Sequence, residues 1–96
     1  IVIGYGASAK WNTIANYGLI DLDYIVDDNP GKQGLLTPGR NTPIYDISKI
    51  DLSKPTTIIC TAWNFLPEIK DRLKKLGITR GTRLVKYFPS IYIEEI

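Results

Sequence analysis

Residues 1–10 read IVIGYGASAK, an apolar run that meets two glycines and then three small residues. The β-branched run over residues 1–5 predicts a strand that is buried on both faces. Ser8 can then cap a helix over about residues 9–17, which Gly18 is expected to end. A buried strand that turns through glycines into a helix is typical of α/β proteins.

The same alternation of strands and helices continues along the chain. Residues 23–27 (DYIVD), 56–61 (TTIICT) and 83–88 (RLVKYF) predict three further strands, and residues 44–45 and 91–93 are candidates for two short ones. Apolar strands that alternate with helices form parallel sheets covered on both faces, with right-handed crossovers. We therefore predict an α/β fold: a small Rossmann-like three-layer domain with a mainly parallel sheet of four to five strands.

Between the third and fourth of the longer strands, apolar residues recur at helical spacing. Asn64 is a candidate cap for this second helix. Two i,i+4 ion pairs are expected on its exposed side, Glu68–Arg72 and Asp71–Lys75. The stripe that would face the core consists of Phe65, Leu66, Ile69, Leu73 and Leu76.

Composition excludes several classes of protein. The chain has 96 residues, and 12 Lys+Arg against 10 Asp+Glu give a net charge of +2, too mild to indicate nucleic acid as a partner. The single cysteine, Cys60, lies in an apolar run and is expected to be a buried thiol. With no histidine, a metal site is not expected. No apolar run approaches the roughly 20 residues of a membrane span, so we expect no membrane partner and a cytoplasmic protein.

The chain begins inside an apolar strand and lacks an initiator Met. We therefore interpret residues 1–96 as a single domain that is a fragment of a longer protein, whose remaining part holds chemistry that this piece lacks. The sequence leaves the formation of oligomers open.

The glycine turn matches G-x-G-x-x-A through Gly4, Gly6 and Ala9, in the strand-to-helix context of dinucleotide-binding domains. In that motif, backbone amides at a helix N-terminus face an anion, and glycines permit its close approach. Asp27 follows at the end of the next predicted strand, where a carboxylate can accept hydrogen bonds from a ribose diol. This pattern alone favours NAD, while a turn with a purely structural role remains an alternative.

Other candidates lie near the same strand ends. Residues 28–42 show no periodicity and form a long loop, a kind of segment that is either functional or a plain surface excursion. Lys10, Lys32 and Arg40 could contact a sugar diphosphate, or they could be ordinary solvated side chains. Trp63 could be a core residue or a stacking platform for a base or sugar.

Three blocks of sequence together identify a family resemblance. GYGASAKWNT (residues 4–13), YIVDDNPGKQGLLTPG (residues 24–39) and TAWNF (residues 61–65) resemble the C-terminal domain of S-adenosylmethionine (SAM)-dependent sugar C-methyltransferases, which act on nucleotide-linked deoxysugars. The resemblance extends over nearly the full chain. It implies an N-terminal zinc-binding segment and a central SAM-binding methyltransferase domain before this one. No cofactor is then expected in this fragment, which would help to form the nucleotide-sugar cleft and be inactive alone.

The carboxyl ends of the strands bring the candidate residues into one predicted site. Turn amides and Lys10 would face the substrate phosphates, residues 32–34 and 37–39 would form a flap, and no residue is assigned as catalytic or metal-binding. Three alternatives stay open: an NAD-type domain, the sugar-nucleotide-binding domain of a sugar acetyltransferase, and a structural or dimer-forming domain. The predicted nucleotide-sugar site consists of Gly4, Tyr5, Gly6, Ala7, Ser8, Lys10, Asn12, Asp27, Asp28, Asn29, Lys32, Trp63 and Asn64.

Overall fold

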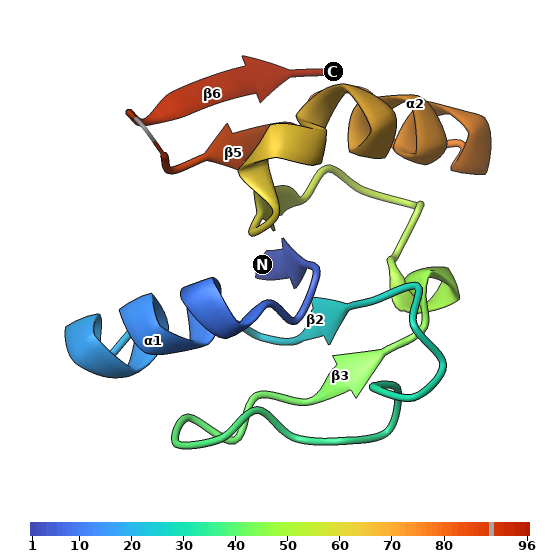
Figure 1. Cartoon of the computed structure of the whole chain (residues 1–96). Helices are drawn as coiled ribbons and strands as arrows, with labels where there is room; N and C mark the ends of the chain where they lie inside the picture. The colour runs from blue at the N-terminus through green and yellow to red at the C-terminus, as the bar shows by residue number, and fades with distance from the viewer. Residues whose placement is uncertain (89) are drawn as a thin grey trace.

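The computed structural model describes residues 1–88 and 90–96 as a mixed α/β domain (Figure 1). The described part of the chain forms one six-stranded sheet in the order β3-β2-β1-β4-β5-β6. The first five strands are parallel, and β6 is antiparallel to β5. The elements are β1 (Val2–Tyr5), α1 (Ala9–Gly18), β2 (Ile25–Val26), β3 (Ile44–Tyr45), η1 (Ile47–Lys49), β4 (Thr57–Cys60), η2 (Trp63–Phe65), α2 (Leu66–Leu76), β5 (Arg83–Lys86) and β6 (Tyr92–Glu95).

This architecture confirms the predicted Rossmann-like fold class, with one more strand than the expected four to five. Both candidate short strands pair with a neighbour: β3 with β2, and β6 with β5. The first strand is central, because Gly4 lies between Ile25 of β2 and Ile59 of β4. No helix of the described residues is long and apolar enough to cross a membrane.

Each face of the sheet carries its own core, so the three predicted layers are present. On one face α2 packs with residues of β1, β4 and β5, and on the other α1 packs with residues of β2 and β3. Cys60 is fully buried, as predicted. The core against α2 contains Ile3, Tyr5, Val26, Ile50, Ile58, Cys60, Leu66, Ile69, Leu73, Ile78 and Leu84. The core against α1 contains Trp11, Ala15, Leu22, Ile25 and Ile44.

The first helix begins as predicted and ends one residue late. Ser8 caps it, since its hydroxyl accepts a hydrogen bond from the Trp11 amide at 3.2 Å. Gly18 is still helical, and Leu19 takes the left-handed conformation at φ 52°. The prediction that Gly18 ends the helix is therefore wrong, because Leu19 closes the last turn with its amide on the Ala15 carbonyl.

The second helix differs more from its prediction. A short 3₁₀ turn, η2, precedes α2 and contains Asn64, so the predicted capping role of Asn64 is wrong. Phe65 occupies the cap position without a side-chain hydrogen bond and is exposed, whereas Leu66, Ile69 and Leu73 are buried as predicted. Gly77 closes the helix at φ 94°. The 3₁₀ turn thus shifts the start of the helix past Asn64, the residue that was predicted to cap it.

The long loop between β2 and β3 is tied to the rest of the domain. Arg40 makes two hydrogen bonds to the carboxylate of Asp21, at 2.8 and 2.6 Å. The Asn16 amide donates to the Pro38 carbonyl, and the Gly34 amide donates to the Ile44 carbonyl. Of the two segments expected to form a flap, residues 32–34 are therefore bonded to β3 and residues 37–39 to α1.

Candidate functional site

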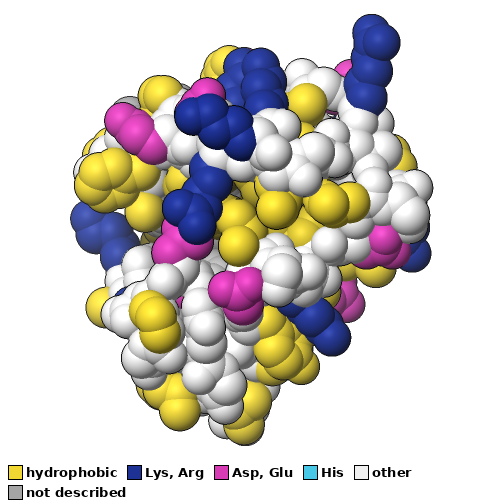
Figure 2. Space-filling view, turned by 90° about the vertical axis from the view of Figure 1, so that its right-hand side faces the viewer, with side chains coloured by type: hydrophobic (Ala, Val, Ile, Leu, Met, Phe, Trp, Pro, Cys, Tyr) yellow, Lys and Arg dark blue, Asp and Glu magenta, His cyan; other side chains and the backbone are white. Residues whose placement is uncertain are grey.

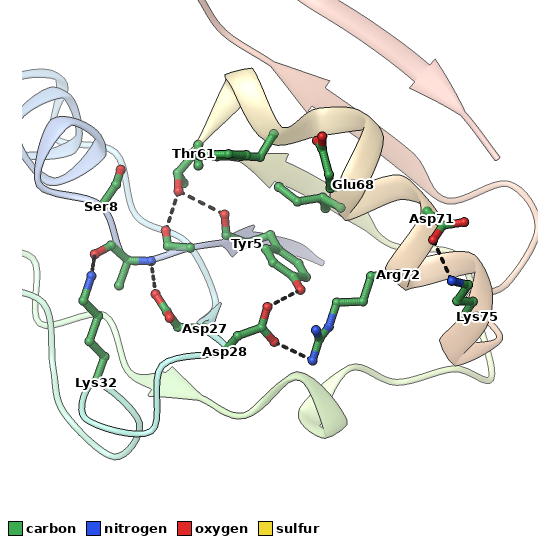
Figure 3. Close-up of a pocket in the computed structure, with 15 residues that line it drawn as sticks. Tyr5, Ser8, Asp27, Asp28, Lys32, Thr61, Glu68, Asp71, Arg72 and Lys75 are labelled. Atoms are coloured by element: carbon green, nitrogen blue, oxygen red, sulfur yellow. Dashed lines mark hydrogen bonds and ion pairs between the residues drawn. The ribbon is translucent and has the colours of Figure 1, made fainter.

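A cavity of about 630 Å³ opens at the carboxyl ends of β1, β2 and β4 and is bounded on one side by α2 (Figure 3). The chain leaves β1 toward β2 on one side, while β4 lies on the other, so the strand order reverses at this point. Open α/β sheets bind ligands at such a reversal. The lining residues are Tyr5, Gly6, Ala7, Ser8, Asp27, Asp28, Lys32, Thr61, Ala62, Phe65, Glu68, Ile69, Asp71, Arg72 and Lys75.

Close packing explains both glycines of the turn. A Cβ on Gly6, which has φ +100°, would lie 2.8 Å from Oγ1 of Thr61. That hydroxyl is fixed by donation shared between the carbonyl oxygens of Tyr5 and Gly6, at 3.0 and 2.5 Å. A Cβ on Gly4 would lie 3.0 Å from Leu22. Gly6 is therefore required by the fold itself, whatever ligand the turn faces, and a side chain at Gly4 would require Leu22 to shift.

Asp27 occupies the position at which an anion would meet the turn. Its Oδ2 accepts a hydrogen bond from the Ala7 amide at 2.8 Å, and its Oδ1 accepts one from the Asn29 amide at 2.8 Å. From the other side, Nζ of Lys32 donates to the Ala7 carbonyl at 2.9 Å. The carboxylate that the dinucleotide pattern would reserve for a ribose thus holds the chain's own backbone (Figure 3).

A second carboxylate links the floor of the cavity to α2. Oδ2 of Asp28 accepts the Tyr5 hydroxyl at 2.8 Å, and its Oδ1 lies 3.0 Å from the Arg72 guanidinium. Figure 3 shows both partners converging on this carboxylate. Burial, and then the hydrogen bond to Asp28, raise the pKa of the Tyr5 hydroxyl above its ordinary 10.0. Tyr5 therefore stays a neutral hydrogen-bond donor at neutral pH.

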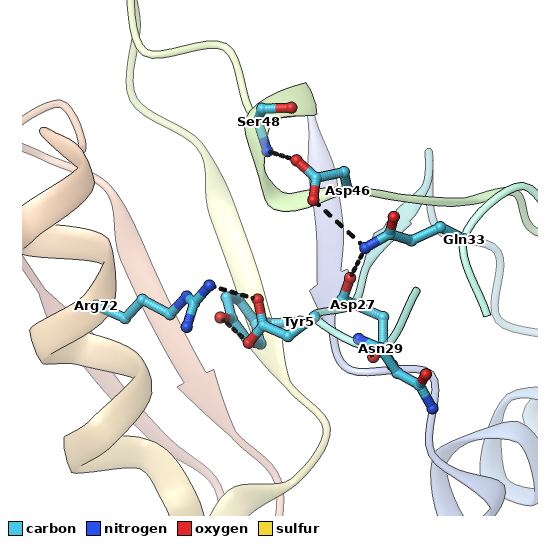
Figure 4. A network of polar contacts seen from close by, with 8 residues as sticks. Tyr5, Asp27, Asn29, Gln33, Asp46, Ser48 and Arg72 are labelled. Atoms are coloured by element: carbon cyan, nitrogen blue, oxygen red, sulfur yellow. Dashed lines mark hydrogen bonds and ion pairs between the residues drawn. The ribbon is translucent and has the colours of Figure 1, made fainter. Parts of the chain in front are cut away.

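Figure 4 shows how the strand ends are joined beyond the cavity. The Gln33 amide donates to the Asp27 carbonyl at 2.9 Å and to Asp46 at 3.3 Å. Asp46 in turn accepts the Ser48 amide at 2.9 Å, and its hydrogen bonds with Ser48 lower the pKa of the Asp46 carboxyl below 3.8. The loop after β2 and the turn after β3 are thereby linked through one charged group.

The structure brings together about half of the predicted site residues and separates the others. Lys10 lies over the Phe88 ring at 5.6 Å, and Trp63 packs on the same ring at 4.9 Å. Asn12 lines a second, mostly apolar cavity of about 400 Å³ between α1 and the loop. Asn29 closes a turn by accepting the Gly31 amide, Asn64 is exposed, and Gly4 is buried. The predicted residues that line the main cavity are Tyr5, Gly6, Ala7, Ser8, Asp27, Asp28 and Lys32.

Sequence reasoning missed the wall of the cavity that α2 supplies. Arg72 was expected to pair with Glu68, and this is wrong, because it reaches across to Asp28. The predicted pair of Asp71 and Lys75 is confirmed at 2.9 Å. Residues Phe65, Glu68, Ile69 and Arg72 follow the i, i+3, i+4, i+7 spacing of one helix face. That spacing, on a helix that starts at the strand reversal, is the sequence signal from which this wall of the cavity could have been predicted.

The fold and the cavity define a doubly wound α/β domain with a ligand-sized hollow at its strand reversal. The family of C-methyltransferase C-terminal domains matches residues 1–89, and the chain belongs to this family. It is also similar to the C-methyltransferase NovU of Streptomyces niveus, with 30% identity over 91 residues that cover 92% of this chain. The chain spans 21% of the length of that relative.

Proposed function

We propose that this domain forms one wall of the substrate cleft in a SAM-dependent C-methyltransferase that acts on a nucleotide-linked deoxysugar. The main support is a cavity of about 630 Å³ at the strand reversal of a chain that belongs to the C-methyltransferase C-terminal family. The chain covers 21% of its C-methyltransferase relative, which leaves room for separate SAM-binding and zinc-binding domains. In this proposal the domain positions the sugar nucleotide and is inactive alone.

The residues of this chain bind and orient the substrate in this proposal but do not transfer the methyl group. Methylation of a sugar carbon beside a carbonyl needs a base that removes a proton from that carbon. Asp27 and Asp28 are both held by hydrogen bonds within the domain, so we assign the base to another part of the enzyme. SAM supplies the methyl group when bound there. Because Asp27 holds the Ala7 and Asn29 amides, we assign it the role of stabilising the turn rather than that of the ribose acceptor for SAM or NAD.

The proposal is tested by titrating the ¹⁵N-labelled chain separately with thymidine diphosphate glucose, NAD and SAM. We expect the sugar nucleotide to shift amides of the turn, of Asp28 and of the first turns of α2, and the other two ligands to leave them in place. Saturable shifts of the same amides by NAD would overturn the proposal in favour of a dinucleotide-binding domain.

A second experiment uses a longer protein that contains the methyltransferase domains. Arg72→Gln, at the cavity wall, should raise KM for the sugar nucleotide about fivefold and leave KM for SAM unchanged. Arg80→Gln is the matched control, since Arg80 is exposed and does not line this cavity. Equal changes in both KM values for Arg72→Gln would contradict a role of this domain in substrate positioning.

A further inference from the structure

The charges that line the main cavity are almost completely used by the domain itself. Arg72 pairs with Asp28 at 3.0 Å, and Lys75 pairs with Asp71 at 2.9 Å. The third cation, Lys32, donates to a backbone carbonyl of the glycine turn at 2.9 Å. Arg72 and Lys75 keep further N–H donors, but a carboxylate beside each of them offsets the positive charge that would attract a phosphate.

Acidic groups outnumber basic ones in this cavity. Four carboxylates line it (Asp27, Asp28, Glu68, Asp71) against three cations (Lys32, Arg72, Lys75). Figure 2 shows side chains of both charges interspersed around hydrophobic ones on one face of the molecule. A diphosphate would meet a site without net positive charge, so Coulomb attraction would not offset the free-energy cost of removing water from the diphosphate.

The same cavity suits a neutral ring that carries hydroxyl groups. Glu68 makes no hydrogen bond or ion pair among residues 1–88 and 90–96, so both of its oxygens are free to accept hydroxyls. Each oxygen of Asp28 has one partner and can accept a second hydrogen bond. Phe65, Ile69 and the ring of Tyr5 supply apolar surface on which the C–H face of a pyranose or ribose can pack.

From these contacts we infer that the cavity recognises a glycosyl ring of the substrate through its hydroxyls, and that the diphosphate lies outside it. The inference rests on the proposed function for the identity of the ligand and makes it more specific. It replaces the expectation that the glycine turn faces the phosphates, since the Ala7 amide is already bonded to Asp27. Glu68 is then a specificity-determining residue, as a hydroxyl acceptor at the start of α2.

The test is a set of NMR titrations of the chain with methyl glucopyranoside, inorganic pyrophosphate and thymidine diphosphate glucose. We expect both sugars to shift the amides around Ser8, Phe65 and Glu68, and pyrophosphate to leave them in place at about 10 mM, a weak-binding concentration. Glu68→Gln should weaken the binding of both sugars about fivefold. Glu95→Gln is the matched control, because Glu95 is exposed on β6 and does not line this cavity.

The outcomes separate this inference from the proposed function. If pyrophosphate shifts the cavity amides or displaces the sugar nucleotide, the inference is wrong and the proposed function stands. If methyl glucopyranoside binds at Glu68 but NAD binds more tightly than the sugar nucleotide, the hydroxyl site stands and the proposed function fails. Absence of shifts with either sugar refutes both.

Discussion

Gly6→Ala is expected to be the most damaging single-methyl change in the turn after β1. The alanine must adopt the φ of +100°, and its Cβ would lie 2.8 Å from Oγ1 of Thr61. The backbone conformation costs about 1–2 kcal/mol, and the overpacking adds about 1–3 kcal/mol. The free energy of unfolding should therefore fall by about 2–5 kcal/mol, measured by equilibrium urea denaturation with an unchanged m value.

Gly77→Ala is the matched control, because Gly77 has φ +94° but nothing within 4 Å of an added Cβ. It should show the backbone cost alone, about 1–2 kcal/mol. Adding Thr61→Ala to Gly6→Ala removes the contacting hydroxyl, so the double variant should be about 1–2 kcal/mol more stable than the sum of the single effects predicts. If Gly6→Ala costs no more than Gly77→Ala, the packing explanation of the turn is refuted.

Three further predictions concern charge and burial. Burial raises the pKa of the Cys60 thiol from 9.0 to about 12, so the native protein should resist alkylation at about pH 8 and react only in urea. Alkylation of the native protein as fast as that of a small free thiol would contradict this. Asp27→Ala should lower the free energy of unfolding by about 2 kcal/mol, because two amides lose a charged acceptor, whereas Asp71→Ala, which removes a surface pair, should change it by less than about 1 kcal/mol. The hydrogen bonds from Arg40 lower the pKa of Asp21 below 3.8. Their contribution to the free energy of unfolding is therefore present above that pH and is lost as the pH falls. Arg40→Gln should flatten the decline in stability between about pH 5 and pH 3.

The fold could be predicted from the sequence because its strongest signals are local and repeated. Apolar runs such as residues 56–61 encode buried parallel strands, and Ser8 before an apolar helical face encodes a helix start. The helix boundaries were harder, since the 3₁₀ turn of residues 63–65 competes with the helical pattern over the same residues. Leu19 takes the left-handed conformation that propensity assigns to glycine, although Gly18 directly precedes it.

The candidate site could be predicted only as far as the strand ends define it. Parallel strands must bring Gly6, Ser8 and Asp27 to one edge, and sheet topology alone fixes this. The partner of Arg72 could not be predicted, because helical spacing points to Glu68 one turn away, while its partner Asp28 belongs to another strand end. Lys10 likewise lies over an aromatic ring of the segment after β5, which no local pattern indicates.

The central position of β1 has a consequence for how the domain folds. Val2 pairs with Thr57, so one edge of β1 stays unpaired during synthesis until β4, which follows it in the chain, has been made. Until then the ribosome-bound chain exposes an unpaired apolar edge, the kind of surface that aggregates or recruits chaperones. Pairing between such distant strands closes large loops, which slows folding. Substitutions that weaken β4 should therefore lower the yield of folded protein in cells more than their effect on equilibrium stability alone would predict.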